Sequence, residues 1–278
     1  MSDTLSFIDE IERAIESGKA TLPVFNPTAQ RVQQELVKSD PDLNVVEKLI
    51  NRDQALASEV LRLANSPCFR GLAEIQTIKA AMVRLGMQEI CRIALLAASK
   101  SQFYSSDRDL RHMLKKLWQH SAGCALAANW LTRRCTYEEL AGQAFFAGLL
   151  HDIGKLAILI VIEQIKMHQA KQMTESLLKE VIQTLHAQQG YALMTAWNMP
   201  EQYCVIVRDH HLVDVDAKNT LLIIIRLANM ACHKLGIGLS TIDNLDMAAT
   251  AEAHLMNLTE LDFAELEIML EDTRALWQ

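Results

Sequence analysis

Residues 144–162 have the sequence AFFAGLLHDIGKLAILIVI, in which His151 and Asp152 stand side by side inside an almost entirely apolar run. A run of this composition is typical of a segment that is buried on most of its faces. A carboxylate taken out of water is strongly destabilising unless it has a partner. A divalent metal ion, a cation such as Lys155, or a set of backbone donors would each serve. The segment therefore predicts a polar site inside an apolar core and leaves its occupant open.

Four other histidines lie on, or at the end of, segments with helical periodicity, where they can join this pair: His120, His186, His210 and His211. Imidazole and carboxylate groups together suit zinc, manganese or iron, and ligands from separate helices of a bundle can converge on one ion. Hydrogen bonding of buried histidines to backbone carbonyls is the structural alternative, and the sequence leaves it open. We expect the remaining histidines to be ordinary side chains: His112, His168, His233 and His254.

The composition favours helices over strands. Of 278 residues, only 10 are Gly and 5 are Pro, while 50% are hydrophobic, which suits long helices around a sizeable core. The sequence therefore predicts an all-α fold. Apolar residues recur with helical spacing over residues 5–16, 28–38, 45–51, 55–64, 78–85, 87–98 and 110–131.

Local signals predict where several of these helices begin and end. Gly18 is a suitable left-handed end for the first helix, and Ser39–Asp40–Pro41 is expected to stop the second. Asn44 with Glu47, and Thr136 with Glu139, are spaced as capping pairs that open the next helices. The polar, aperiodic stretch 99–108 predicts a boundary between two packed helical subdomains, residues 1–107 and 108–278.

Charge and apolar patterning argue against several classes of function. The 34 acidic and 27 basic side chains give a net charge of −7, without a basic stripe, so we expect no nucleic-acid partner. Charged residues interrupt the two most apolar stretches, 144–162 and 221–232, so neither is expected to span a membrane. The N-terminus lacks the pattern of a secretory signal, and the six scattered cysteines have no Cys-x-x-Cys pair. We expect a cytoplasmic protein with reduced, mostly buried cysteines.

His120, the pair His151–Asp152 and the following Gly154–Lys155 resemble the HD superfamily. Its metal-dependent phosphohydrolases use a His, a His-Asp pair and a later Asp as metal ligands. His186 and then His210–His211 follow in the same order as in the subgroup that hydrolyses cyclic dinucleotides. The resemblance implies that the C-terminal subdomain is an HD-like helical bundle with a C-terminal helical extension.

The N-terminal half is similar to the HDOD domain, a branch of this superfamily. The similarity runs from about residue 20 to 236 and is carried by Leu22–Pro23, Asp53-Gln-Ala-Leu56, Leu61-Arg-Leu-Ala-Asn-Ser66, Leu85–Gly86 and Trp197-Asn-Met-Pro200. HDOD proteins are regarded as signalling or regulatory modules of bacteria, without an established catalytic activity. The resemblance therefore implies a bacterial signalling module.

The resemblance also implies a set of site residues. Metal ligands are expected among His120, His151, Asp152, His186, His210, His211 and Asn229. Asn229 stands where the phosphohydrolases present their final Asp, and Asn is a neutral and weaker ligand. We therefore expect a divalent ion such as iron, manganese, zinc or nickel to bind weakly or partially. The Gly-Tyr-Pro signature of the cyclic-dinucleotide phosphodiesterases is also missing.

Two functions follow from these residues. The first is an HDOD-type regulatory module with a degenerate phosphohydrolase site. Its expected partner is a signalling protein or a small phosphorylated or nucleotide ligand, and a second copy of the chain, in a homodimer, is a further candidate partner. The alternative is a metal-dependent phosphohydrolase acting on phosphomono- or diesters, with Asp152 and Lys155 as catalytic residues. The lost carboxylate at Asn229 favours the module.

Overall fold

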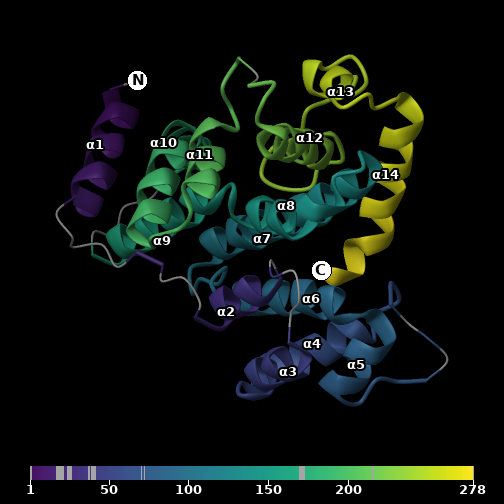
Figure 1. Cartoon of the computed structure of the whole chain (residues 1–278). Helices are drawn as coiled ribbons and strands as arrows, with labels where there is room; N and C mark the ends of the chain where they lie inside the picture. Colours follow the sequence, from purple (N-terminus) through teal and green to yellow (C-terminus); the bar gives the residue numbers. More distant parts are fainter. Residues whose placement is uncertain are drawn as a thin grey trace.

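The computed structural model describes residues 2–16, 22–23, 27–36, 38, 42–69, 71, 73–168, 173–214 and 216–277, and these residues contain helices and no strand (Figure 1). The all-α prediction is confirmed. The first six helices are α1 (Ser2–Glu16), α2 (Pro27–Leu36), α3 (Leu43–Asn51), α4 (Gln54–Ala64), α5 (Ile78–Leu85) and α6 (Met87–Lys100). The others are α7 (Arg108–Arg134), α8 (Ala141–Leu150), α9 (Ile153–His168), α10 (Glu175–Ala196), α11 (Glu201–Asp209), α12 (Thr220–Lys234), α13 (Ala251–Leu255) and α14 (Glu260–Asp272).

The helices form two groups that meet along α8. In the first group α6 contacts α2, α3, α4 and α5, and in the second α7 runs through the centre and contacts α8, α9, α12 and α14 (Figure 1). Helix α1 comes first in the sequence but packs with the second group, where it contacts α9 and α10. The division at residues 107 and 108 stays a prediction, because α1 belongs spatially to the helices that come after it.

The stretch between α6 and α7 is attached to the second group. The Ser105 hydroxyl donates to the Glu163 carboxylate on α9, and Lys166 on the same helix pairs with Asp107, the N-cap of α7. These contacts fix the start of α7 against α9. Helix α7 carries His120 and α9 begins directly after Asp152, so both are held in a defined position.

Two of the predicted helix starts are wrong. Asp42, not Asn44, is the N-cap of α3, because its side chain accepts from the Asn44 backbone N–H. Thr136 does not open a helix either: with a φ of 61° it lies in the left-handed region and follows Cys135, the C-cap of α7. The next turn is a short 3-10 helix, Glu138–Leu140, without a side-chain cap. The predicted helix ends at Gly18 and Ser39–Pro41 lie outside the described residues.

Three glycines allow close helix packing around the centre of the second group. A Cβ at Gly148 would lie 2.7 Å from the Cys124 carbonyl oxygen, so α8 fits against α7 only with glycine there. A Cβ at Gly154 would lie 1.8 Å from the His186 carbonyl oxygen, and one at Gly190 would lie 2.5 Å from Val207. Glycine thus brings α9, α10 and α11 together, and with them the histidines that these helices carry.

One hydrophobic core extends through both groups of helices, from Phe7 and Ile11 to Leu270. Among the described residues, one stretch, Glu138–Met167, is long and apolar enough to cross a membrane, with a mean hydropathy of 2.0 in its most apolar window. Of that window, 94% is buried inside the protein. It supplies the central core helices α8 and α9, and core helices of globular proteins meet the same criterion, so it is weak evidence for a membrane span.

Candidate metal centre

Four buried imidazoles are held in the same tautomer. Each Nδ1 atom faces a backbone carbonyl oxygen, which only accepts, so Nδ1 carries the proton and donates it. The pairs are His120 with Ile237 at 2.9 Å, His151 with Gly148 at 2.8 Å, His186 with Ile182 at 2.9 Å and His210 with Val207 at 2.9 Å. The Nε2 atom of every ring is therefore left with a lone pair.

All four Nε2 atoms point at the carboxylate of Asp152. The distances to Oδ2 are 3.3 Å from His120 and 3.5 Å from His151, and those to Oδ1 are 3.4 Å from His210 and 3.7 Å from His186. Asp152 lies between α8 and α9, so the ligands of this cluster come from α7, α10, the C-cap of α11 and the α8–α9 junction. Lone pairs that face a carboxylate repel it unless a cation lies between them.

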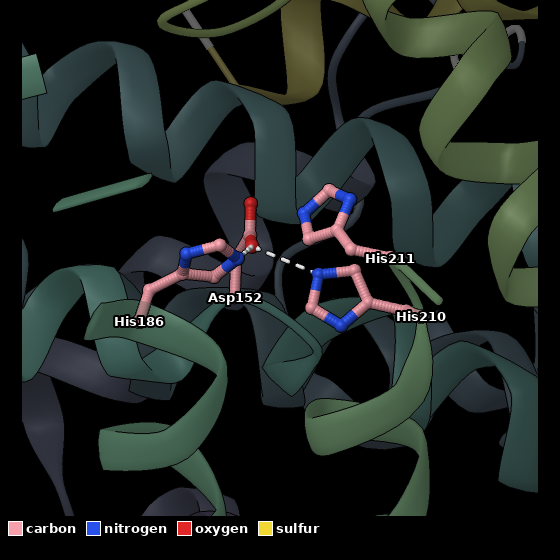
Figure 2. A group of neighbouring side chains, drawn as sticks. All are labelled: Asp152, His186, His210 and His211. Atoms are coloured by element: carbon pink, nitrogen blue, oxygen red, sulfur yellow. Dashed lines mark ion pairs between the residues drawn. The ribbon is translucent and has the colours of Figure 1, made fainter. Parts of the chain in front are cut away.

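Lys155 supplies such a cation on one side only. Its Nζ atom lies 2.6 Å from Asp152 Oδ2. On the other side, Asp152 Oδ1, His186 Nε2 and His210 Nε2 are buried without a hydrogen-bond partner. Figure 2 shows the His186 and His210 rings on either side of the Asp152 carboxylate, with His211 next to His210. Three unsatisfied acceptors at one point are the arrangement that a metal ion satisfies.

Burial sets the protonation of the cluster. It lowers the pKa of His186 to about 4 and moves the pKa of His151 well below its usual range. Burial by itself raises the pKa of Asp152, but the Lys155 ammonium, 2.6 Å from Oδ2, outweighs it and holds this pKa well below its usual range. At neutral pH His151 and His186 are thus neutral and Asp152 is ionised, which are the forms that bind metal.

The donor set fits a divalent transition metal. One ligand atom from each of Asp152, His186, His210 and His211 lies within 4.8 Å of the others, and a second group of the same kind joins His120, His151 and Asp152. Imidazole-rich sets with one carboxylate suit zinc, iron or nickel better than magnesium or calcium, which prefer oxygen. Because Lys155 already neutralises Oδ2, the group around Oδ1 is the one that lacks a cation.

A cavity of about 570 Å³ opens onto His210 and His211. Asn229, on α12, lies in its wall with an exposed fraction of 5%, and its Oδ1 is buried without a hydrogen-bond partner. The rim carries both charges, with Lys179 and Arg226 on the basic side. A polar ligand in this cavity would reach the edge of the histidine cluster.

The structure brings together seven of the predicted site residues and places the eighth beside them. The seven are His120, His151, Asp152, Lys155, His186, His210 and His211, and Asn229 stands in the adjacent cavity wall. His112 and His254 are exposed, as expected of ordinary side chains, and the side chain of His168 lies outside the described residues.

The expectation that His233 is an ordinary side chain stays a prediction, although its surroundings are not those of a surface residue. Its ring is buried with its centroid 4.8 Å from that of His120, its Nδ1 donates to the Ser240 carbonyl oxygen, and burial lowers its pKa to about 4. The sequence contained one signal of this: His233 follows Asn229 by four residues, which places both on one face of α12. Cys124 follows His120 by the same spacing, and its Sγ atom lies with that of Cys232 in a further group of possible metal ligands around His120.

Comparisons with known proteins bear on the fold and the family of the chain. A protein of Treponema pallidum (strain Nichols) described as uncharacterized is 25% identical over 196 residues, which are 68% of this chain and 37% of that protein. The chain therefore spans little more than a third of that relative.

Two crystal structures have the same fold over nearly the whole chain. An HDOD domain protein of unknown function from Geobacter sulfurreducens has a TM-score of 0.78 at 22% identity, covering 98% of both chains. A candidate metal-dependent phosphohydrolase from Shewanella amazonensis SB2B has a TM-score of 0.74 at 19% identity and covers 100% of both. A candidate signal transduction protein from Marinobacter aquaeolei VT8 has a TM-score of 0.67 at 21% identity, over 92% of this chain and 59% of that one.

At these identities the solved structures establish the fold and leave the activity open. The match to a family is more direct, since the model of the HDOD domain covers residues 22–213, which include α2 to α11 and the Asp152 cluster. The chain therefore belongs to the HDOD domain family.

Proposed function

We propose that this chain is a regulatory module that binds a divalent cation at Asp152 and a small phosphorylated or nucleotide ligand in the adjacent cavity, with little or no hydrolysis. The observation that carries the proposal is the convergence of Asp152 Oδ1, His186 Nε2 and His210 Nε2, which are all buried and unpartnered. Buried polar atoms without partners are costly, and a cation bound between three of them at one point removes that cost.

The cation is expected to bind weakly for its number of ligands. Asp152 is the one carboxylate of the set, and Lys155 already offsets its charge. A divalent ion there keeps excess positive charge in a region that excludes water. Zinc, iron, manganese and nickel are the candidates, and we expect substoichiometric loading that a chelator removes without unfolding the protein.

The alternative function, metal-dependent phosphohydrolysis, has its own support in the similar fold of the Shewanella protein. In such an enzyme the metal activates water for attack on a phosphoester. Two features of this chain oppose it. Asn229 places a neutral amide at the cavity wall, and Lys155 is engaged with Asp152 at 2.6 Å and is not free to hold phosphoryl oxygens. We therefore place the regulatory function first.

The cavity offers complementary groups for a nucleotide-like ligand. Lys179 and Arg226 carry charges that suit phosphate, although Arg226 also pairs with Glu252 at 2.6 Å. The buried Oδ1 of Asn229 offers an acceptor for an amino or ring N–H group of a base. Binding of this ligand would be passed on to a signalling protein of the cytoplasm, or to the second subunit of a homodimer. The likeness to the Marinobacter signal transduction protein supports a signalling role.

Metal content and turnover test the proposal together. Protein purified without a histidine tag is analysed for metals before and after chelation, and unfolding is followed in both states. Phosphodiesters, nucleotides and cyclic dinucleotides are then offered with zinc, iron or manganese. We expect partial loading, an intact fold after chelation and no turnover above background. Robust hydrolysis that His151→Ala and Asp152→Ala abolish would reverse the order of the two functions.

A further inference from the structure

A second cluster of ligand atoms lies behind the first, on the side of His120. The Nε2 of His120 and the Sγ atoms of Cys124 and Cys232 all lie within 4.8 Å of one another. His120 is 2% exposed and both cysteines are 0% exposed. No thiol takes part in the Asp152 centre or in the proposed regulatory function, so this cluster is unexplained by either.

Two helices assemble the cluster. His120 and Cys124 lie one turn apart on α7 and share a face of it, while Cys232 comes from α12, which packs on α7. Gly123 leaves room for Cys232, since a Cβ there would make a tight contact of 3.1 Å with Cys232 Sγ. The crossing of α7 and α12 thus brings both thiols to one imidazole.

The distance between two of the donors matches a tetrahedral metal site. With zinc–sulfur and zinc–nitrogen bonds of about 2.3 and 2.0–2.1 Å, a tetrahedral ion holds its sulfur and nitrogen ligands roughly 3.5 Å apart. Cys124 Sγ lies 3.6 Å from His120 Nε2. That nitrogen is already committed as an acceptor, because Nδ1 of the same ring donates to the Ile237 carbonyl oxygen.

The other neighbours of His120 Nε2 also call for a cation. His151 Nε2 and Asp152 Oδ2 both lie 3.3 Å away, and neither brings a proton in the tautomers described above. A thiol S–H is a weak donor and satisfies this nitrogen poorly. Two cysteines that served only as small apolar residues would gain nothing from an imidazole lone pair.

We propose that His120, Cys124 and Cys232 form a second, sulfur-rich metal site, which takes zinc or a softer cation such as cadmium or copper(I). Two thiolates and one imidazole are a set that soft and borderline cations prefer, whereas the imidazole–carboxylate set around Asp152 Oδ1 prefers harder ones. His233, whose ring lies 4.8 Å from that of His120, also lines the 570 Å³ cavity.

The site links the two centres through one nitrogen. An ion held by Cys124 and Cys232 binds the lone pair of His120 Nε2, which lies 3.3 Å from Asp152 Oδ2. Occupancy of the sulfur site therefore changes the surroundings of Oδ2 while leaving the ligands around Oδ1, which are His186, His210 and His211, in place. If the chain has the proposed regulatory function, the module thereby responds to the concentration of soft metal ions in the cell.

Cobalt(II) is the probe for the test, because thiolate ligation gives an intense near-ultraviolet charge-transfer absorption and imidazole–carboxylate ligation does not. Wild-type protein, reduced and free of tag and metal, is titrated with up to two equivalents. We expect the charge-transfer band in wild type, its loss in Cys124→Ser and Cys232→Ser, and its retention in Cys91→Ser. Cys91 is the matched control, since it is 1% exposed and lies in α6.

A second measurement needs no variant. X-ray absorption of wild-type protein with two equivalents of zinc is expected to show sulfur neighbours at about 2.3 Å. Nitrogen and oxygen neighbours alone, or a cobalt band that both serine variants retain, would overturn the proposal. The variant His186→Ala separates the two sites: it should weaken metal binding at Asp152 and keep the thiolate band. Loss of the sulfur signal with intact binding at Asp152 would refute this inference alone.

Discussion

Lys155 Nζ lies 2.6 Å from Asp152 Oδ2, and the two side chains are 7% and 0% exposed. This buried ion pair divides the carboxylate into two unlike oxygens. Oδ2 has an internal cation, and Oδ1 faces His186 and His210 without one. The difference explains why the same carboxylate is stable in the folded protein and still has room for an external ion.

Lys155→Met tests this division. Removing one member of a buried pair leaves an uncompensated charge, so we expect the metal-free protein to lose about 3 kcal/mol of unfolding free energy. Divalent metal should bind this variant more tightly than wild type, because a neighbouring positive charge is gone. Urea unfolding with and without zinc measures both effects. The control is Lys166→Met, whose pair with Asp107 is partly exposed and should contribute less than about 1 kcal/mol.

His186→Ala removes a ligand from the Oδ1 side. We expect divalent-metal affinity to fall by at least about tenfold, since even residues that only support a metal ligand have effects of this size. Calorimetric titration with zinc gives the affinity, and exposed His254→Ala is the matched control. Equal affinity in His186→Ala and wild type would place the ion elsewhere.

Asn229→Asp returns a carboxylate to the cavity wall. We expect divalent-metal affinity to rise by about tenfold, because an anionic ligand offsets the charge of the ion. Asn219→Asp adds the same charge to the N-cap of α12 and serves as the control. If both variants bind metal as wild type does, Asn229 is not part of the metal environment.

Gly154→Ala tests the packing that assembles the site. The new Cβ would lie 1.8 Å from the His186 carbonyl oxygen, which belongs to the backbone of α10 and cannot move aside alone. We expect a loss of about 3 kcal/mol or more, measured by thermal or urea unfolding. Gly71→Ala is the control, because its Cβ would meet only the flexible end of Arg84. Wild-type stability in Gly154→Ala would show that α9 and α10 can separate.

Glu59 gives the first group of helices an acid-sensitive contact. Its hydrogen bond to Arg62 and the charge of Lys100 lower its pKa from 4.5 to about 2. The lowered pKa stabilises the fold above pH 4.5, and this contribution is lost as the pH falls from 4.5 towards 2. Because these side chains are partly exposed, we expect Glu59→Gln to cost roughly 0.5 kcal/mol at pH 7 and nothing near pH 2. Denaturant unfolding across this range, with exposed Glu74→Gln as control, measures it.

Features that depend on a few neighbouring residues could be predicted from the sequence. The helix at 78–85 has the predicted bounds, because apolar spacing and the flanking Gly86 act locally. Burial of His151 and Asp152 followed from the apolar run around them, and both are at most 1% exposed. The prediction that Thr136 opens a helix was wrong because the end of α7 and the start of the next helix compete for the same residues. The end of α7 determined the left-handed conformation of Thr136.

The sequence by itself determined the all-helical fold, the family and the histidines and carboxylate of the site, since these are encoded in periodicity and in residue types at fixed spacings. Only the tertiary structure decided which atom faces which. The Ile237 carbonyl oxygen fixes the tautomer of His120, the packing of α10 on α9 and of α11 on α10 turns the Nε2 atoms of His186 and His210 towards Oδ1 of Asp152, and the crossing of α7 and α12 joins Cys124 and Cys232. Those contacts join residues between 34 and 117 positions apart. They depend on helix crossings that glycines permit, which no local pattern encodes.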